Sequence, residues 1–146
     1  MRIFLDTSSL FKLYHRETQT AEIESLFSIV KITTLFVSEI TKIEFASTVW
    51  KKVRTKDITE AEAQVTLTLF ESDFTKYAFV VTDSIIIEQA RMLISKYGIQ
   101  GLRTLDSIQL ATAVSLFQQV DIFFSADKIL ELLFEAEGLQ TKMPIR

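Results

Sequence analysis

The chain has 146 residues, of which 48% are hydrophobic, and a formal net charge of −3 at pH 7, which fits one domain over residues 1–146. It contains no cysteine, which excludes disulfides and thiolate metal sites and makes a reducing cytoplasm the expected location. No apolar run approaches the roughly 18 residues of a membrane helix, and the net charge excludes a strong global attraction for nucleic acid.

Apolar runs alternate with amphipathic segments in the first part of the chain. The apolar run at 2–5 predicts a buried strand, and Asp6 with the hydroxyl residues after it predicts a turn and a helix start. Further on, apolar side chains at helical spacing predict helices. In chain order we expect a short helix at 10–14, a helix at 20–30, a strand at 35–37 and a helix at 40–54.

The second part of the chain carries helix caps. Thr59 and Glu62 form a capping box, which predicts a helix from Thr59 to about residue 77. Gly98 and Gly138 are typical of helix C-terminal stops. We then expect a strand at 78–81, a helix from caps at 82–84 to Gly98, a helix at 102–118 with Thr104 as N-cap, a strand at 122–124, a helix at 126–137 and a short last strand at 140–143.

This alternation predicts a three-layer α/β/α fold with a central parallel sheet of four to five strands. In such sheets, ligands bind beyond the carboxyl ends of the strands. Asp6 directly follows the first predicted strand, and Asp127 closely follows the fourth. Both carboxylates therefore fall at the same edge of the sheet, although each is equally suited to capping the helix that follows it.

Two further carboxylates lie on predicted helices. Asp106 lies in the first turn of its helix, where its helical neighbours are mostly apolar and small. A charge in such surroundings is costly unless a cation pairs with it, and Arg103 is the alternative to a metal as that cation. Glu44 lies on the helix that begins straight after the second strand, near the same edge, and Glu39 is an alternative acid there.

The predicted cluster of acids favours a hard divalent cation. Carboxylates that converge without matched cations repel one another, and a bound metal ion relieves that repulsion. The chain has no cysteine and one histidine, so zinc, which prefers nitrogen and sulfur ligands, fits poorly. Mg²⁺ or Mn²⁺ suits a site made only of oxygen ligands and promotes hydrolysis of phosphodiesters. The number of ions stays open.

One basic cluster lies near the end of the helix predicted at 40–54, and it includes Lys51, Lys52 and Arg54. Cations in this position can contact RNA phosphates. They can equally complement the helix dipole, because the C-terminal end of a helix carries a partial negative charge. The sequence leaves both interpretations open.

Four segments carry a family resemblance. They are residues 3–8 (IFLDTS), 38–45 (SEITKIEF), 105–113 (LDSIQLATA) and 124–128 (FSADK). In this order, and at this chain length, they resemble the PIN-domain family, and within it the VapC-type toxins of bacterial and archaeal toxin–antitoxin pairs. The resemblance spans nearly the whole chain and implies a parallel sheet.

The resemblance also implies an activity, a cofactor and partners. It implies an endoribonuclease that cleaves single-stranded RNA with Mg²⁺ or Mn²⁺. The catalytic residues and metal ligands that it implies are Asp6, Glu44, Asp106 and Asp127. Thr7 and Ser125 would support them through hydrogen bonds. A homodimer and a small antitoxin partner are further expectations, and the RNA target stays open between ribosomal RNA, tRNA and mRNA.

Other families that begin with a strand and an Asp fit less well. A phosphatase of the haloacid-dehalogenase type needs a second Asp two residues after the first, where this chain has Ser8. A receiver domain needs an acidic pair in its first loop, which this sequence does not have. The alternative that remains is a non-catalytic PIN-like module that binds RNA or acts as a scaffold.

Overall fold

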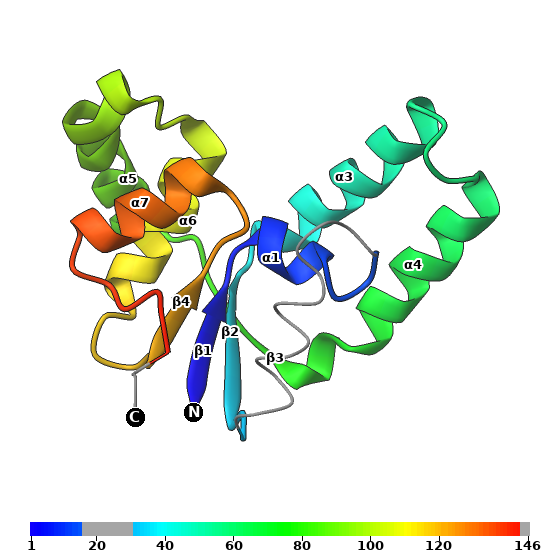
Figure 1. The fold of residues 1–146 in the computed structure, drawn as a ribbon, viewed down its shortest axis with the longest axis horizontal. Coiled ribbons are helices and arrows are strands. Elements are labelled where there is room, and N and C mark those ends of the chain that lie inside the picture. The colour runs from blue at the N-terminus through cyan, green and yellow to red at the C-terminus, as the bar shows by residue number, and fades with distance from the viewer. Residues whose placement is uncertain (16–30, 144–146) are drawn as a thin grey trace.

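A four-stranded parallel sheet forms the centre of the structure, a computed structural model that describes residues 1–15 and 31–143. The strands are β1 (Arg2–Leu5), β2 (Thr34–Ser38), β3 (Tyr77–Val80) and β4 (Ile122–Phe124). Their order is β3-β2-β1-β4, and each neighbouring pair is parallel. The chain therefore adds β2 and β3 on one side of β1 and β4 on the other (Figure 1). The helix predicted at 20–30 lies outside the described residues.

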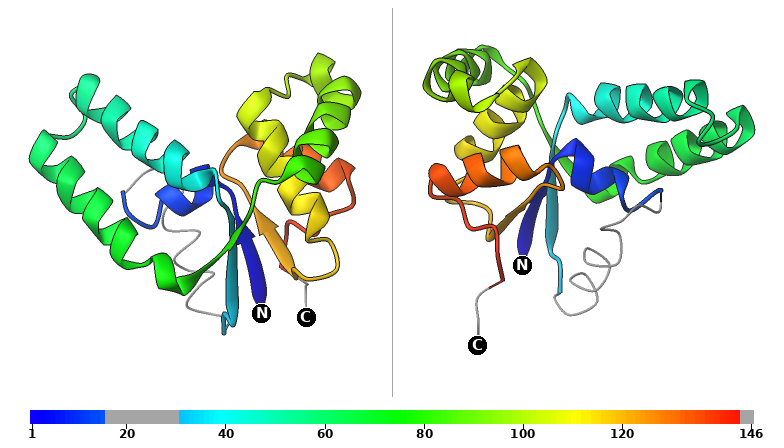
Figure 2. Two further views of the ribbon diagram at one scale, coloured as in Figure 1. Left: turned by 180° about the vertical axis from the view of Figure 1, so that it is seen from behind. Right: turned by 45° about the horizontal axis from the view of Figure 1, so that its top comes forward.

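Helices cover both faces of the sheet, as Figures 1 and 2 show. One face carries α1 (Thr7–Phe11), α3 (Thr41–Arg54) and α4 (Glu60–Ser72). The other carries α5 (Ser84–Tyr97), α6 (Thr104–Ser115) and α7 (Lys128–Ala136). This arrangement confirms the predicted three-layer α/β/α fold with a central parallel sheet. Within the described ranges, none of these helices combines the length and the apolar character needed to cross a membrane.

The central strand β1 contributes side chains to both layers of the core. Ile3 and Leu5 pack with α1, α3 and α4, whereas Phe4 packs with α5, α6 and α7. All three side chains are fully buried. Successive side chains of a strand point to opposite faces, so a short, continuous apolar run is what a strand covered on both sides requires.

Side-chain caps begin most of the helices. Asp6 caps α1, Asp83 caps α5 and Asp127 caps α7, and the capping box of Thr59 with Glu62 is confirmed at the start of α4. The N-cap predicted for α6 was wrong. Arg103 holds the N-cap position there without a side-chain hydrogen bond, because Thr104 is already the first helical residue.

Helix ends differ from the prediction. Helix α4 ends at Ser72 rather than near residue 77, because a 3₁₀ turn (Phe74–Lys76) leads into β3, where Tyr77 already pairs with β2. Helix α5, in contrast, ends at Tyr97 with Gly98 as its C-cap, as predicted. A second 3₁₀ turn (Gly98–Gln100) follows it, and Gly101 then adopts the left-handed conformation, with φ 100°. The predicted last strand at 140–143 is absent from the described residues, although the Phe123 N–H donates to the carbonyl of residue 140.

Candidate functional site

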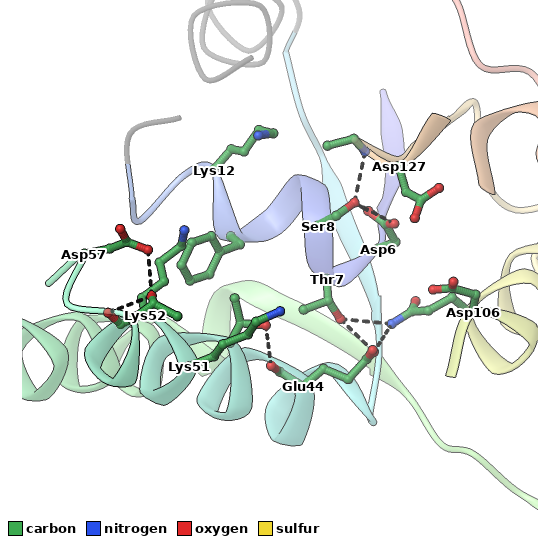
Figure 3. Close-up of a pocket in the computed structure, with 15 residues that line it drawn as sticks. Asp6, Thr7, Ser8, Lys12, Glu44, Lys51, Lys52, Asp57, Asp106 and Asp127 are labelled. Carbon is green, nitrogen blue, oxygen red and sulfur yellow. Dashed lines mark hydrogen bonds between the residues drawn. The ribbon is translucent and has the colours of Figure 1, made fainter. Parts of the chain in front are cut away.

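The acids predicted from the sequence come from different elements and line one cleft of about 560 Å³ (Figure 3). Asp6 follows β1, and Asp127 lies between β4 and α7. Glu44 lies on α3, and Asp106 lies in the first turn of α6. The cleft thus opens beyond the carboxyl ends of β1 and β4, where the direction of strand addition reverses and where α/β sheets commonly bind ligands.

Asp6 is buried and held by serine residues. Its Oδ1 accepts hydrogen bonds from the Ser9 N–H at 2.9 Å and the Ser9 hydroxyl at 2.8 Å. The Ser125 hydroxyl donates to Oδ2 at 2.6 Å, and the Ser8 hydroxyl lies within 2.9 Å of Oδ1 and 2.8 Å of Oδ2. Burial raises the pKa of Asp6, and the hydrogen bonds from these serines oppose the rise. Asp6 therefore caps α1 and faces the cleft at once.

Glu44 is half-buried and held by neutral donors at one oxygen. The Thr7 hydroxyl donates to Glu44 Oε1 at 2.8 Å, and the Gln109 side-chain amide donates to the same oxygen at 2.8 Å. Glu39, the alternative acid, lies elsewhere: it is exposed, and its carboxylate accepts from the Thr82 N–H at 3.4 Å. Of the two acids, Glu44 is the one that lines the cleft.

Asp127 both caps a helix and faces the cleft. Its Oδ1 accepts from the N–H groups of Ile129 at 2.9 Å and Leu130 at 3.0 Å, at the start of α7. The Ser125 hydroxyl oxygen accepts from the Asp127 N–H at 3.0 Å while its hydrogen is directed to Asp6. Ser125 therefore joins the two acids that follow β1 and β4.

The carboxyl group of Asp106 is also strongly perturbed. Its pKa rises to about 6, first because burial disfavours the charged form and then because Asp127, Asp6 and Glu44 repel it. Arg103 opposes this rise, but its influence on the pKa is smaller than that of burial or of any of the three acids. Asp106 accepts no hydrogen bond from the described residues. The three other acids are thus near enough to raise the pKa of Asp106, and Arg103 offsets their effect only in part.

The donor set suits a hard divalent cation. All the acids offer oxygen ligands, and neither sulfur nor histidine nitrogen lines the cleft. As the side chains are placed in residues 1–15 and 31–143, no three acidic or histidine groups are drawn together tightly enough to form a closed metal cage. The residues therefore fit Mg²⁺ or Mn²⁺ by their chemistry, in an open arrangement of carboxylates.

Cations also line the cleft, together with a further acid, Asp57. Lys51 and Lys52 of α3 lie there as predicted, together with Lys12, which follows α1 and was not predicted from the sequence. The Lys52 ammonium lies 5.7 Å from the centre of the Phe11 ring. Arg54, the third predicted cation, is exposed and does not line the cleft. Of the predicted basic cluster, Lys51 and Lys52 therefore line the cleft, whereas Arg54 lies on another side of the helix.

A second cavity of about 360 Å³ adjoins the cleft on the side away from the lysines. Glu44 and Asp106 line both cavities, and Arg103 lines the second one. Glu44 and Asp106 thus lie between the two cavities, each of which is also lined by cationic side chains.

Several polar residues that contact the acids were not predicted from the sequence. They are Ser8, Ser9 and Gln109. Thr41 was not predicted either, and it contacts Thr7 and Gln109 rather than an acid. The signal available for Gln109 was its place three residues after Asp106 on the same helix face. Thr41 has the same spacing before Glu44.

Comparison with known proteins agrees with the fold. The family description of the PIN domain matches residues 3–133. The crystal structure of Mycobacterium tuberculosis VapC20, a sarcin–ricin loop cleaving toxin, is similar with a TM-score of 0.71 and 16% sequence identity, covering 97% of this chain and 99% of that chain. VapBC2 from Rickettsia felis, bound to a DNA fragment from its promoter, is similar with a TM-score of 0.62 and 13% identity over 97% of this chain and 98% of that chain. No curated protein matches the sequence.

Proposed function

Because the chain belongs to the PIN-domain family, we propose that it is a Mg²⁺- or Mn²⁺-dependent endoribonuclease that cleaves single-stranded RNA. One observation carries the proposal: carboxylates from separate elements line one cleft, where burial and their mutual repulsion raise the pKa of Asp106 to about 6. A protein gains nothing in stability from such a cluster unless a cation binds it. Divalent metal sites of this kind serve phosphodiester hydrolysis.

In this proposal the metal ligands and catalytic residues are Asp6, Glu44, Asp106 and Asp127. A bound ion would supply an activated water and would stabilise charge on the phosphate. Hydrogen bonds from Ser125 and Thr7 hold Asp6 and Glu44 in place before any ion binds. Asp106 accepts no such bond within the described ranges, so it has the most to gain from a cation.

The cations around the acids support an extended phosphate chain as the substrate. Lys12, Lys51 and Lys52 would contact phosphates on one side of the cleaved bond. Arg103, in the adjoining cavity, would contact a phosphate on the other side. A nucleoside monophosphate has a single phosphate and can occupy only one of these places, so an RNA strand that crosses the acids is the better fit.

We further propose that the protein is the cytoplasmic toxin of a toxin–antitoxin pair, forming a homodimer and binding a small antitoxin. VapC20 is named for cleaving the sarcin–ricin loop, and the VapBC2 structure contains promoter DNA, so the similar folds support this role by analogy. Apolar side chains on α5 remain exposed, including Ile85 at 67% and Met92 at 71%. Such a surface is suited to a protein partner.

Cleavage of a fluorescent single-stranded RNA tests the proposed activity. We expect cleavage with Mn²⁺ or Mg²⁺ and none in EDTA. Glu44→Gln should abolish cleavage, because an amide is a poorer ligand for a hard cation. Glu39→Gln is the matched control, since Glu39 lies only five residues away but outside the cleft, and it should cleave like the wild type.

The outcome separates the proposal from its alternative. Full activity in EDTA would contradict a metal mechanism. Tight RNA binding without cleavage under every metal condition would instead indicate a non-catalytic PIN-like module that binds RNA or acts as a scaffold.

A further inference from the structure

Gln109 of α6 lines the cleft and contacts Glu44 of α3. The Gln109 side chain is 1% exposed. Its Nε2 lies 2.8 Å from Glu44 Oε1, 3.0 Å from Thr41 Oγ1 and 3.1 Å from Thr7 Oγ1. Thr41 is fully buried and Thr7 nearly so. Two uncharged side chains, from α1 and α6, thus contact this carboxylate oxygen directly, and Thr41 of α3 contacts both of them.

The hydrogens of this network can be assigned. A carboxylate oxygen only accepts, so the Thr7 hydroxyl donates to Glu44 Oε1 at 2.8 Å. Thr7 Oγ1 can then accept from the Thr41 hydroxyl, which lies 3.0 Å away. The two amide hydrogens of Gln109 go to Glu44 Oε1 and Thr41 Oγ1. The hydrogens therefore lead to Glu44 Oε1, either directly or through the two threonines.

The orientation of the Gln109 amide follows from Glu44. Gln109 Oε1 is buried and has no hydrogen-bond partner among the described residues. An unpaired buried acceptor is unfavourable, so a hydrogen bond to Gln109 Oε1 is not what determines the orientation of the amide. Turning the amide over would place Oε1 against Glu44 Oε1, and two acceptors at that distance repel. The contact with the carboxylate thus determines which way Gln109 points.

From this geometry, and resting on the proposed function, we infer that Gln109 is a positioning residue for the metal site. It holds Glu44 by Oε1 and leaves Oε2, which accepts no hydrogen bond from the described residues, for a cation in the cleft. Gln109 acts through Glu44 and does not bind the ion itself. Partners of this kind, which orient a ligand from behind, commonly change metal affinity by about 10- to 100-fold.

Direct Mn²⁺ binding, followed by electron paramagnetic resonance without RNA, tests the inference. Gln109→Met keeps the length of the side chain and removes its donors. We expect this variant to bind Mn²⁺ at least about 10-fold more weakly than the wild type. Thr112→Val is the matched control, because Thr112 is also buried on α6, but its side-chain hydroxyl donates only to the Ile108 carbonyl. It should bind Mn²⁺ like the wild type.

A double-mutant cycle shows whether Gln109 acts through Glu44. In a Glu44→Gln background, Gln109→Met should cause little further loss of Mn²⁺ affinity. Equal losses in both backgrounds, or wild-type affinity in Gln109→Met, would overturn the inference. Should Gln109→Met fail to fold by circular dichroism, Thr41→Val decides instead. That variant removes one acceptor of the Gln109 amide and should also weaken Mn²⁺ binding, and wild-type affinity there would overturn the inference.

A measurement without metal separates this inference from the proposed function. The side-chain amide signals of Gln109 in a ¹⁵N NMR spectrum should shift when Glu44 is replaced by Gln, and should stay unchanged in Glu39→Gln. If the wild type binds no Mn²⁺ but these signals shift, the proposed metal mechanism fails while the positioning of Glu44 holds. If the signals do not respond to Glu44→Gln, the positioning itself is wrong.

Discussion

At the scale of residues, Asp6 and Asp106 share a cleft but have different surroundings. Asp6 receives hydrogen bonds from several serines, such as Ser125 at 2.6 Å. Asp106 receives none from the described residues, and burial together with the neighbouring carboxylates raises its pKa to about 6. Neutral donors therefore fix one acid in place, whereas the other is left under strain that only a proton or a cation can relieve. This difference makes Asp106 the most informative position to change.

Asp106→Asn should stabilise the metal-free protein and abolish cleavage. The pKa of Asp106 is about 6 in the folded chain against an ordinary value of 3.8, so the folded state holds this proton more tightly. Ionisation of Asp106 therefore lowers the free energy of unfolding. This loss is complete above about pH 6, and it disappears below about pH 4, where the carboxyl group is protonated in both states. Asn is uncharged, so the variant does not lose this part of the free energy of unfolding. Because Asp106 is only half-buried, we expect a gain of about 1 kcal/mol near neutral pH.

Urea unfolding in EDTA, at neutral pH and at pH 4, measures this effect. The wild type and Asp106→Asn should differ at neutral pH and converge at pH 4. A variant that is less stable than the wild type yet still cleaves RNA would show that Asp106 is a structural partner of Arg103 instead.

The acids were predicted from the sequence, and Thr7 and Ser125 were predicted as residues that support them, but Thr41 and Gln109 were not. Asp6 and Asp127 follow strands, and Asp106 falls in the first turn of a helix, so local pattern is enough to single them out. Thr41 and Gln109 act through contacts between α3, α1 and α6. Such contacts depend on how helices pack, which the spacing of residues within one helix does not reveal.

At the scale of elements, α3 presents different side chains to the cleft and to solvent. Glu44, Thr48, Lys51 and Lys52 line the cleft, whereas Arg54 does not. The starts of helices were largely predictable because caps are local hydrogen bonds, as with Thr59 and Asp83. The end of α4 was not, because the pairing of Tyr77 with β2 determines where the chain leaves the helix.

Lys51→Ala should weaken RNA binding more than Arg54→Ala. Both residues are cations near the end of α3, but only Lys51 lines the cleft. Removing one phosphate interaction with a single strand should reduce the slope of log affinity against log salt by about 0.7. Binding of a non-cleavable RNA, measured by fluorescence anisotropy over a range of salt concentrations, gives both slopes. Equal slopes for Lys51→Ala and the wild type would indicate that the lysine only complements the helix dipole.

At the scale of the whole molecule, the strand order creates the site. Because β4 is added beside β1, on the side away from β2, the segments after β1 and β4 separate at one point of the sheet edge. Asp6 and Asp127 lie in those two segments, and Ser125 links them. The alternation of strands and helices predicted a parallel sheet, but it did not predict this order. The order depends on which edge the last strand joins, and that choice is not encoded in periodicity.

Mn²⁺ should stabilise the whole chain, and more strongly near neutral pH than at pH 5. An ion that binds only the folded state raises the free energy of unfolding by mass action, by about 2.7 kcal/mol when its concentration is 100 times its dissociation constant. A protonated carboxyl must release its proton before it can bind a cation. With a pKa of about 6, Asp106 is mostly protonated at pH 5 in the metal-free protein. Affinity, and with it the stabilisation, should therefore increase as the pH rises through about 6.

Melting temperatures with Mn²⁺ and with EDTA, at pH 5 and at pH 7.5, give the stabilisation by the ion at each pH. The wild type should show a clearly larger difference at pH 7.5. Asp106→Asn is the control, because its amide has no proton to release at this position and is a weaker ligand than a carboxylate. The increase in melting temperature that Mn²⁺ causes in this variant should be small and nearly independent of pH between 5 and 7.5. A wild-type shift that is equal at both pH values, or a full shift in Asp106→Asn, would contradict a role for Asp106 in holding the ion and would leave the other carboxylates of the cleft to account for metal binding.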